Sequence, residues 1–314
     1  MKKYELLKTD SIQYDNLTLY RIKALIDFSD VKAGQVGGYV ENEKNLSQEG
    51  NAWVYDNAQV YGDARVYDNA HVYDGACVSG NAQVYGKARI YDKACVSYNT
   101  QVYGNAHVYD NAQVYGEAHV YYDARVYEKA QVYGEARVYE KAQVYGEAQV
   151  YGEAYVYNDA HIYDEAQVSG KSQVYGDARV YGEAYVYNKA QVSGKSQVYE
   201  KAQVYGKVHV SGKAQVYDEA QVYGEAHVSD KAQIYDEAQV YGEAHVSGKS
   251  RVYDEAWVYG EARISGNAEI KNKTDYIVFK NNWSSGRFFT YTKSNRMWQV
   301  GCFYGTGDEL VKKA

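Results

Sequence analysis

Aliphatic residues recur at every sixth position through the middle of the chain. From Val54 to Ile270 all 37 such positions hold Val or Ile, with no insertion or deletion. A small residue, most often Ala, stands two positions earlier, and Gly, Asp, Asn or Glu mostly stands two positions later. A period of six leaves no apolar stripe at the 3.6-residue spacing of a helix. The pattern therefore predicts short strands with Val pointing inward and its neighbours outward, a tight inner corner at Ala, and a turn after each strand.

Substitutions within the repeat recur every eighteen residues. Ser replaces Tyr at Ser211, Ser229 and Ser247, and a His stands two positions before each of them. A file of Tyr residues also runs unbroken at this spacing from Tyr55 to Tyr253. If three hexapeptides form one coil, residues eighteen apart stack on neighbouring coils. We therefore expect an all-β fold, a single-stranded parallel β-helix shaped as a triangular solenoid, with 18 residues per coil and about 12 coils.

The chain divides into three parts by pattern. We expect an N-terminal cap and first coil over residues 1–50, the β-helix over 51–270, and a small basic, aromatic C-terminal cap domain over 271–314. Both open ends of a solenoid need covering, because unpaired strand edges bind other chains. Val40 and Leu46 start the inner register, with a two-residue offset before Val54. We expect a strand or strand pair within residues 18–28, further strands within 275–279, 287–293 and 296–305, and a short helix from Asp308.

The repeat resembles a known family. The unit V-Y-G-E-A-Q is similar to that of the hexapeptide-repeat left-handed parallel β-helix proteins, and the stretch from Asp30 to Ala58 resembles the N-terminal part of the YdcK-like acetyltransferases among them. The resemblance implies a left-handed coil and a trimeric acyltransferase that uses acetyl-CoA. The family places a catalytic His near a subunit cleft beside protruding loops. Here no loop interrupts residues 54–270, and all seven His precede Val or Ile. A site between the subunits of a trimer stays open, with His227 and His245 as its catalytic candidates.

Composition indicates the cellular compartment of the protein, and the charge is distributed unevenly along the chain. The N-terminus lacks the apolar core of a signal peptide, no run of eighteen apolar residues occurs, and three Cys do not make a disulfide framework. A cytoplasmic protein with no membrane partner is expected, with Cys77 and Cys95 as stacked free thiols. The net charge of −7 is uneven, because residues 51–270 hold 19 basic and 30 acidic side chains while residues 271–314 hold 8 basic and 3 acidic.

Two surfaces of the predicted coil are candidates for binding. One is an acidic edge, which we read either as a solvated corner or as a mimic of a nucleic-acid strand. The other is a polar, basic face open to anions or to an acidic partner, although its His have no carboxylate or thiolate to complete a metal site. The acidic edge holds Asp218, Asp236, Asp254, Glu219, Glu237 and Glu255. The Ser/His/Lys face holds Ser211, Ser229, Ser247, His209, His227, His245, Lys195, Lys213, Lys231 and Lys249.

A flat wall lacks the concavity that a small-molecule site needs. The sequence therefore favours a non-catalytic, rod-like binding or scaffold protein that needs no cofactor and meets a protein partner along a face or through the C-terminal cap. That cap resembles a small module of phage and mobile-element proteins, and its basic and aromatic residues leave nucleic-acid contact open. A nucleic-acid-mimicking inhibitor and the trimeric acyltransferase are the alternatives, and homo-oligomers stay open.

Overall fold

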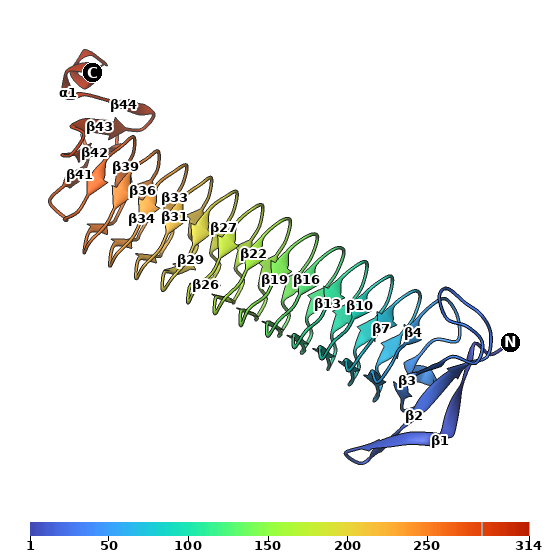
Figure 1. The fold of residues 1–314 in the computed structure, drawn as a ribbon. Helices are drawn as coiled ribbons and strands as arrows, with labels where there is room; N and C mark the ends of the chain where they lie inside the picture. The colour runs from blue at the N-terminus through green and yellow to red at the C-terminus, as the bar shows by residue number, and fades with distance from the viewer. Residues whose placement is uncertain (284, 314) are drawn as a thin grey trace. The chain divides into compact units, whose positions relative to one another are not determined.

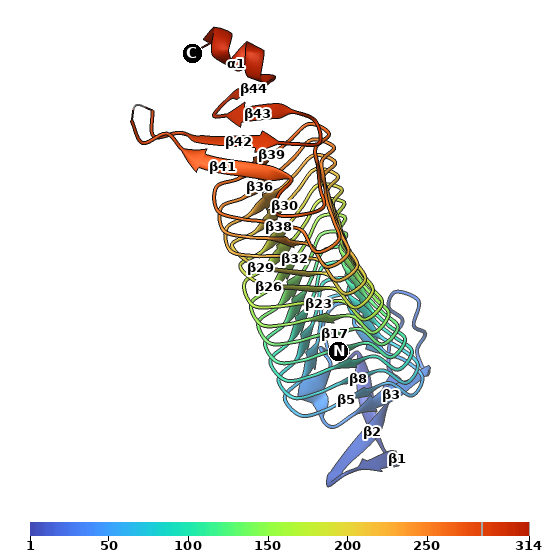
Figure 2. The same cartoon turned by 90° about the vertical axis from the view of Figure 1, so that its left-hand side faces the viewer.

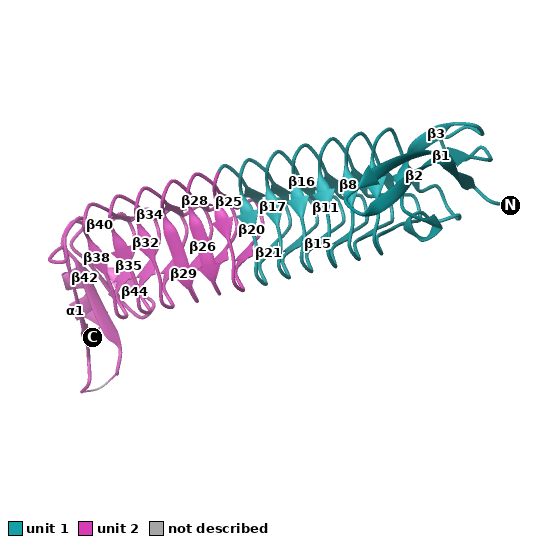
Figure 3. Cartoon of the chain, turned by 90° about the horizontal axis from the view of Figure 1, so that it is seen from below, with its two compact units in different colours: residues 1–164 teal, residues 165–314 magenta. Residues whose placement is uncertain are grey.

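The computed structural model describes residues 1–283 and 285–313 and consists of two compact units, Met1–Asp164 and Glu165–Ala314 (Figure 3). In both units each hexapeptide forms a strand of two residues, or of four at Tyr185–Asn188 and Gln203–Gly206. These strands pair in parallel with the strand eighteen residues away, for example Arg89 with His107. The walls of each unit are visible along the solenoid in Figure 2. The predicted all-β parallel solenoid is confirmed, with 18 residues per turn and about 13 turns in the chain.

The first wall of unit 1 consists of β3 (Val36–Val40), β5 (Gln59–Val60), β8 (Cys77–Val78), β11 (Cys95–Val96), β14 (Gln113–Val114), β17 (Gln131–Val132) and β20 (Gln149–Val150). The second consists of β4 (Trp53–Val54), β7 (His71–Val72), β10 (Arg89–Ile90), β13 (His107–Val108), β16 (Arg125–Val126), β19 (Gln143–Val144) and β22 (His161–Ile162). The third consists of β6 (Arg65–Val66), β9 (Gln83–Val84), β12 (Gln101–Val102), β15 (His119–Val120), β18 (Arg137–Val138) and β21 (Tyr155–Val156).

Unit 2 has the same three walls. The first consists of β23 (Gln167–Val168), β26 (Tyr185–Asn188), β29 (Gln203–Gly206), β32 (Gln221–Val222), β35 (Gln239–Val240) and β38 (Trp257–Val258). The second consists of β25 (Arg179–Val180), β28 (Gln197–Val198), β31 (Gln215–Val216), β34 (Gln233–Ile234), β37 (Arg251–Val252) and β40 (Glu269–Ile270). The third consists of β24 (Gln173–Val174), β27 (Gln191–Val192), β30 (His209–Val210), β33 (His227–Val228), β36 (His245–Val246) and β39 (Arg263–Ile264).

The interior is built from the two apolar positions of the repeat. The Val or Ile of each strand and the small residue before it are fully buried, as at Ala130 and Val132. The backbone N–H groups of the outward-facing residues donate to carbonyls of the next turn, for example Gln131 to Ala148 at 2.9 Å. The residue two places after Val has positive φ, 69° at Gly146 and 58° at Glu128. Gly tolerates this left-handed conformation without strain and Asp or Asn at little cost, which explains the residue preference there.

The N-terminal cap is an antiparallel hairpin that leads into the first turn (Figure 1). Strand β1 (Tyr4–Tyr14) pairs with β2 (Leu17–Ala24), which pairs with β3. The predicted two-residue offset is confirmed, because Val40 pairs with Val60 and Leu46 with Val66, twenty residues apart. A short 3₁₀ helix, η1 (Glu43–Asn45), lies within this first turn.

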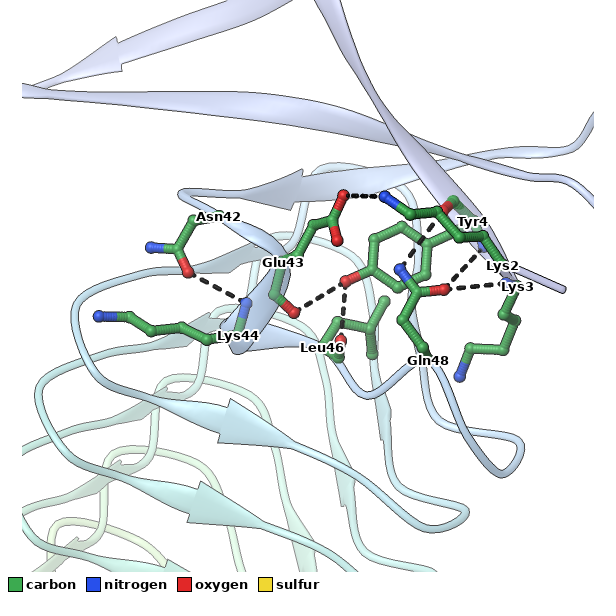
Figure 4. A network of polar contacts seen from close by, with 8 residues as sticks. All are labelled: Lys2, Lys3, Tyr4, Asn42, Glu43, Lys44, Leu46 and Gln48. Atoms are coloured by element: carbon green, nitrogen blue, oxygen red, sulfur yellow. Dashed lines mark hydrogen bonds and ion pairs between the residues drawn. The ribbon is translucent and has the colours of Figure 1, made fainter.

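Side chains of the hairpin fix the first turn in place (Figure 4). The hydroxyl of Tyr4 donates to the Leu46 carbonyl at 2.7 Å, and the amide oxygen of Gln48 accepts from the Lys3 backbone N–H at 2.9 Å. The Lys3 ammonium is buried and donates to the Ala52 carbonyl at 2.9 Å, so burial lowers its pKa to about 8. These contacts give otherwise unpaired carbonyls of the open end a donor.

The C-terminal module is a four-stranded antiparallel sheet in the order β41 (Tyr276–Lys280), β42 (Phe288–Thr292), β43 (Met297–Val300) and β44 (Phe303–Gly305), followed by helix α1 (Gly307–Lys313). The strand expected within residues 296–305 is two strands, because Gly301 turns the chain with φ of 55°. Side chains of the module pair with the last turn, where Thr290 accepts from the N–H of Arg263 at 3.0 Å and Ser294 from that of Glu269 at 2.8 Å. Among the described residues, no helix has the length and apolar character needed to cross a membrane.

Candidate functional site

The acidic edge has a structural role that the sequence did not reveal. Asp218, Asp236 and Asp254 occupy the positive-φ position of successive turns. The Asp218 carboxylate accepts the backbone N–H of Asp236 at 3.3 Å, and the Asp236 carboxylate accepts that of Asp254 at 3.1 Å. The same ladder occurs in unit 1, where the carboxylates of Asp92, Asp110 and Glu128 accept from the next turn at 3.2, 3.1 and 2.7 Å. Each of these five accepting carboxylates satisfies a backbone donor of the turn stacked on it, while the Asp254 carboxylate lies 3.1 Å from the Lys271 ammonium.

The next column of the acidic edge is different. Glu219, Glu237 and Glu255 are exposed, each one residue after an Asp of the ladder. Glu219 lies 3.8 Å from the ammonium of Lys201 in the turn before it. Exposed pairs of this kind contribute little to stability, on the order of 0–1 kcal/mol. The edge thus consists of a half-buried Asp column, in which Asp218 and Asp236 accept backbone N–H groups, and an adjacent column of solvent-exposed Glu.

The His residues of the Ser/His/Lys face form the stack that was predicted. His209, His227 and His245 are successive residues of β30, β33 and β36. Their rings are parallel, with centroids 4.8 Å apart for the first pair and 4.7 Å for the second. Partial burial lowers the pKa of both His227 and His245, and the adjacent imidazole lowers it further. His227 and His245 therefore favour the neutral form of the ring.

The other residues of this face lie in parallel columns beside the His. Ser211, Ser229 and Ser247 are half-buried after the core Val. Lys195, Lys213, Lys231 and Lys249 are exposed at the adjoining corner, and Lys195 lies 3.6 Å from the Asp177 carboxylate. Ser250 occupies an inner Ala position and donates to the Ser247 carbonyl at 2.6 Å. The structure brings the predicted residues together as columns, but nothing converges on one reacting point.

No metal centre is found on these surfaces. Within the part of the chain that the structure describes, no three or more His, Cys, Asp or Glu side chains gather so that they could hold a metal ion. The stacked imidazoles have no carboxylate beside them in their own column, which continues from His245 to Arg263. A general base would also need a neighbour to orient it and a concave place for substrate.

The Tyr files stack as ladders. Neighbouring rings are parallel, with centroids 4.8 Å apart for Tyr91 and Tyr109 and 4.9 Å for Tyr115 and Tyr133. Hydroxyls also brace one file against the next, since Tyr115 donates to the side-chain oxygen of Gln131 at 3.2 Å. Burial raises the pKa of Tyr91 to about 12, with the neighbouring phenol Tyr109 as the second cause. The ladders stabilise the walls through same-face pairs of side chains.

The C-terminal module has the surface feature that sequence reasoning missed. A hollow of about 530 Å³ is lined by Phe279, Lys280, Asn281, Asn282, Trp283 and Phe289. Trp283 is 99% exposed, and Ile277 and Phe279 on the edge strand β41 are about half exposed. Phe279 stacks on Phe289 with centroids 5.2 Å apart. Trp283 is much more exposed than the other aromatic residues of the module, of which Phe279 is 47% and Tyr304 39% exposed.

Comparison with known proteins supports the repeat assignment. Four segments match the family model described as the YdcK β-solenoid repeat, over residues 58–74, 101–116, 130–146 and 172–188. These segments are therefore similar to YdcK-type β-solenoid repeats. The predicted resemblance to YdcK-like proteins is thereby confirmed. The chain is also 44% identical over 63 residues to the "Uncharacterized acetyltransferase YdcK" of Escherichia coli (strain K12). That match covers 18% of this chain and 19% of the YdcK relative, so the similarity spans about a fifth of either protein.

Proposed function

We propose that this YdcK-repeat solenoid is a non-catalytic binding protein whose C-terminal module engages a protein partner. The observation that carries the proposal is the hollow beside Trp283, where a fully exposed indole borders Phe279 and Phe289. Exposed aromatic residues around a hollow are typical of binding hot spots, because they bury much apolar area when a partner docks. Single exposed aromatic residues are ordinary, but a group that lines one hollow indicates a contact site.

The charge of the C-terminal module indicates which kind of protein partner it would bind. The module region, residues 271–314, has 8 basic and 3 acidic side chains. Lys280 lines the hollow, and its ammonium lies 5.2 Å from the ring centroid of Phe288. A partner that inserts an apolar side chain and presents carboxylates around it would complement both features.

The proposal is also supported by the solenoid, because many of its surface side chains already pair with one another or with the backbone. Residues 51–270, all within the described part of the chain, continue as strand and turn with no inserted loop. Their outward side chains form Tyr and His ladders, Gln233 donates to the side-chain oxygen of Gln215 at 2.8 Å, and Asp carboxylates such as that of Asp218 accept backbone N–H groups. Such walls suit a spacer that presents a binding module.

The test is capture of partners from nuclease-treated lysate of the source cells, with three full-length baits. Wild-type bait is expected to retain one protein in stoichiometric amount. Trp283→Ala is expected to lose it, and Trp257→Ala is the matched control, because Trp257 is 48% exposed on the solenoid wall in β38. Equal capture by all three baits would contradict the assignment to the hollow. Capture that occurs in untreated lysate but not in the nuclease-treated one would indicate nucleic acid as the ligand.

An acetyltransferase is the second candidate, favoured by the name of the E. coli relative. It requires acetyl-CoA binding and a subunit cleft that contains His227 or His245. Calorimetry with millimolar acetyl-CoA, together with light scattering to detect a trimer, decides the question. Heat of binding that is lost in His227→Ala or His245→Ala would replace the binding proposal with the catalytic one. Absence of heat at that concentration would exclude the enzyme.

The nucleic-acid mimic is tested through the acidic edge. Charge reversal of Glu219, Glu237 and Glu255 leaves the backbone-bonded Asp ladder intact, so it changes the surface charge without removing a backbone partner. If the acidic edge mimics a nucleic-acid strand, the charge-reversed variant should no longer capture a nucleic-acid-binding protein. Unchanged capture would remove the acidic edge as a binding surface.

A further inference from the structure

Two cysteines occupy neighbouring rungs of the first wall in unit 1. Cys77 in β8 and Cys95 in β11 are direct partners in the parallel pairing, and both are free thiols. Neighbouring strands lie about 4.7–4.9 Å apart, and the Cα atoms of disulfide-bonded residues lie about 4.4–6.8 Å apart. The backbone register therefore already holds the two residues at a separation that a disulfide accepts.

The tyrosine file beside these thiols is interrupted at the same two turns. After the core Val, this wall has Tyr61, then Ser79 and Ser97, then Tyr115, so both cysteines occur in the sequence Cys-Val-Ser. In the other repeats of this wall in unit 1 the position after Val is Tyr. Replacing two phenol rings with two hydroxymethyl groups opens the space beside the sulfur atoms. A small reagent can thus approach the thiols from solvent.

The two thiols are not equivalent. Cys77 is half-buried, and its sulfur lies 3.4 Å from the hydroxyl of Tyr61, while Cys95 is exposed. The hydrogen bond from Cys95 lowers the pKa of Cys77 to about 7, assisted by the hydroxyls of Tyr61 and Ser79. The same pairing raises the pKa of Cys95. One thiolate next to one thiol is the arrangement of an attacking and a resolving cysteine.

We propose that Cys77 and Cys95 form a dithiol site that reacts with low-molecular-weight disulfides. The Cys77 thiolate attacks one sulfur of the disulfide, which forms a mixed disulfide and releases one thiolate. Cys95 then loses its proton to solvent, attacks the Cys77 sulfur and releases the second thiolate. The two protein thiols are oxidised to one disulfide, and the small disulfide is reduced to two thiols.

The test exposes the reduced full-length chain to oxidised glutathione at neutral pH and follows the products by peptide mass spectrometry. A disulfide between the Cys77 and Cys95 peptides, with loss of two hydrogen atoms, is the expected product. Cys302 in the C-terminal module is an internal control that should carry only a glutathionyl group. Reduced glutathione in excess should reverse the bond.

Single variants separate the roles of the two residues. Cys95→Ser should accumulate the mixed disulfide on Cys77, and Cys77→Ser should react at Cys95 several-fold more slowly. Serine fits this wall position, because the side chain points outward and the core is unchanged. A glutathionyl group that stays on Cys77 of the wild-type chain, or equal rates at Cys77 and Cys302, would overturn the proposal. Circular dichroism confirms that each variant is folded before reaction.

Discussion

The residue two places after each core Val has two tasks. It takes the left-handed conformation that turns the chain, with φ of 56° at both Asp218 and Asp236. When it is Asp or Glu, its carboxylate can also accept the N–H of the same position one turn later, as Asp218 does from Asp236 at 3.3 Å. The turn preference could be predicted from residue type. The carboxylate ladder could not, because it depends on a direction and distance between turns that composition does not specify.

Substitution of Asp236 separates these tasks. Asp236→Ala removes the acceptor for the Asp254 N–H. It also places Ala, which has no polar side chain to stabilise this backbone conformation, in the left-handed region. We expect a loss of about 2 kcal/mol in the free energy of unfolding, from the unpaired donor and the backbone conformation together. Asp236→Asn keeps an acceptor oxygen and tolerates this φ, so its loss should be about 0.5 kcal/mol or less. Equal losses in urea denaturation would contradict the ladder's role.

At the scale of elements, the repeat strands were predictable and the caps only in part. The two-residue offset before Val54 and the strands of the C-terminal module follow from where the apolar spacing breaks. Strand β1 was not predicted, because most of Tyr4–Tyr14 is exposed or half-exposed and shows no clear alternation. The exposure of Trp283 was also missed, since sequence does not say which aromatic residues of a small sheet pack inward.

The buried Lys3 is the clearest test of the N-terminal cap. Its ammonium donates to the carbonyl of Ala52 at 2.9 Å and lies 5.1 Å from the ring centroid of Phe28. Lys3→Met keeps the aliphatic packing but leaves the buried Ala52 carbonyl without this donor. We expect a loss of about 1–3 kcal/mol. Hydrogen exchange should locate it in the hairpin and first turn, with Lys2→Met, at an exposed ion pair with Glu43, as the control. Undiminished protection would contradict this role.

At the scale of the whole molecule, the Tyr ladders make the free energy of unfolding decrease at alkaline pH. Burial raises the pKa of Tyr85, Tyr121 and Tyr139 to about 12, against 10.0 for an ordinary phenol, and neighbouring Tyr add to the shift. Since the folded pKa is the higher one, these groups favour the folded state below pH 10, and that contribution is lost as pH rises from about 10 to 12.

The prediction is steep, cooperative unfolding in this interval. Phenolate absorbance and loss of far-ultraviolet circular dichroism should change together, over a narrower pH range than independent phenols give. Free tyrosine amide in the same buffers provides the reference titration. Gradual phenolate formation near pH 10 with an unchanged dichroism spectrum would show that the ladders do not resist ionisation.

Repetition also makes single turns dispensable. Deleting residues 118–135 in unit 1 removes β15, β16 and β17 and joins Glu117 to Ala136 in the same phase of the repeat. Strand β18 then meets β12 with its Val in register. We expect a cooperative thermal transition within a few degrees of that of the intact chain, because each turn contacts only its neighbours. Loss of cooperativity would mean that the turns are not equivalent.

The constant separation of paired strands within each unit has a consequence for synthesis. Residues that pair are eighteen apart, or twenty in the first turn, whatever the number of turns. As the chain leaves the ribosome, each new strand finds its partner among residues that emerged just before it. The nascent chain then never holds much more than one turn of unpaired, aggregation-prone sequence, so lengthening the repeat does not slow the closing of any contact.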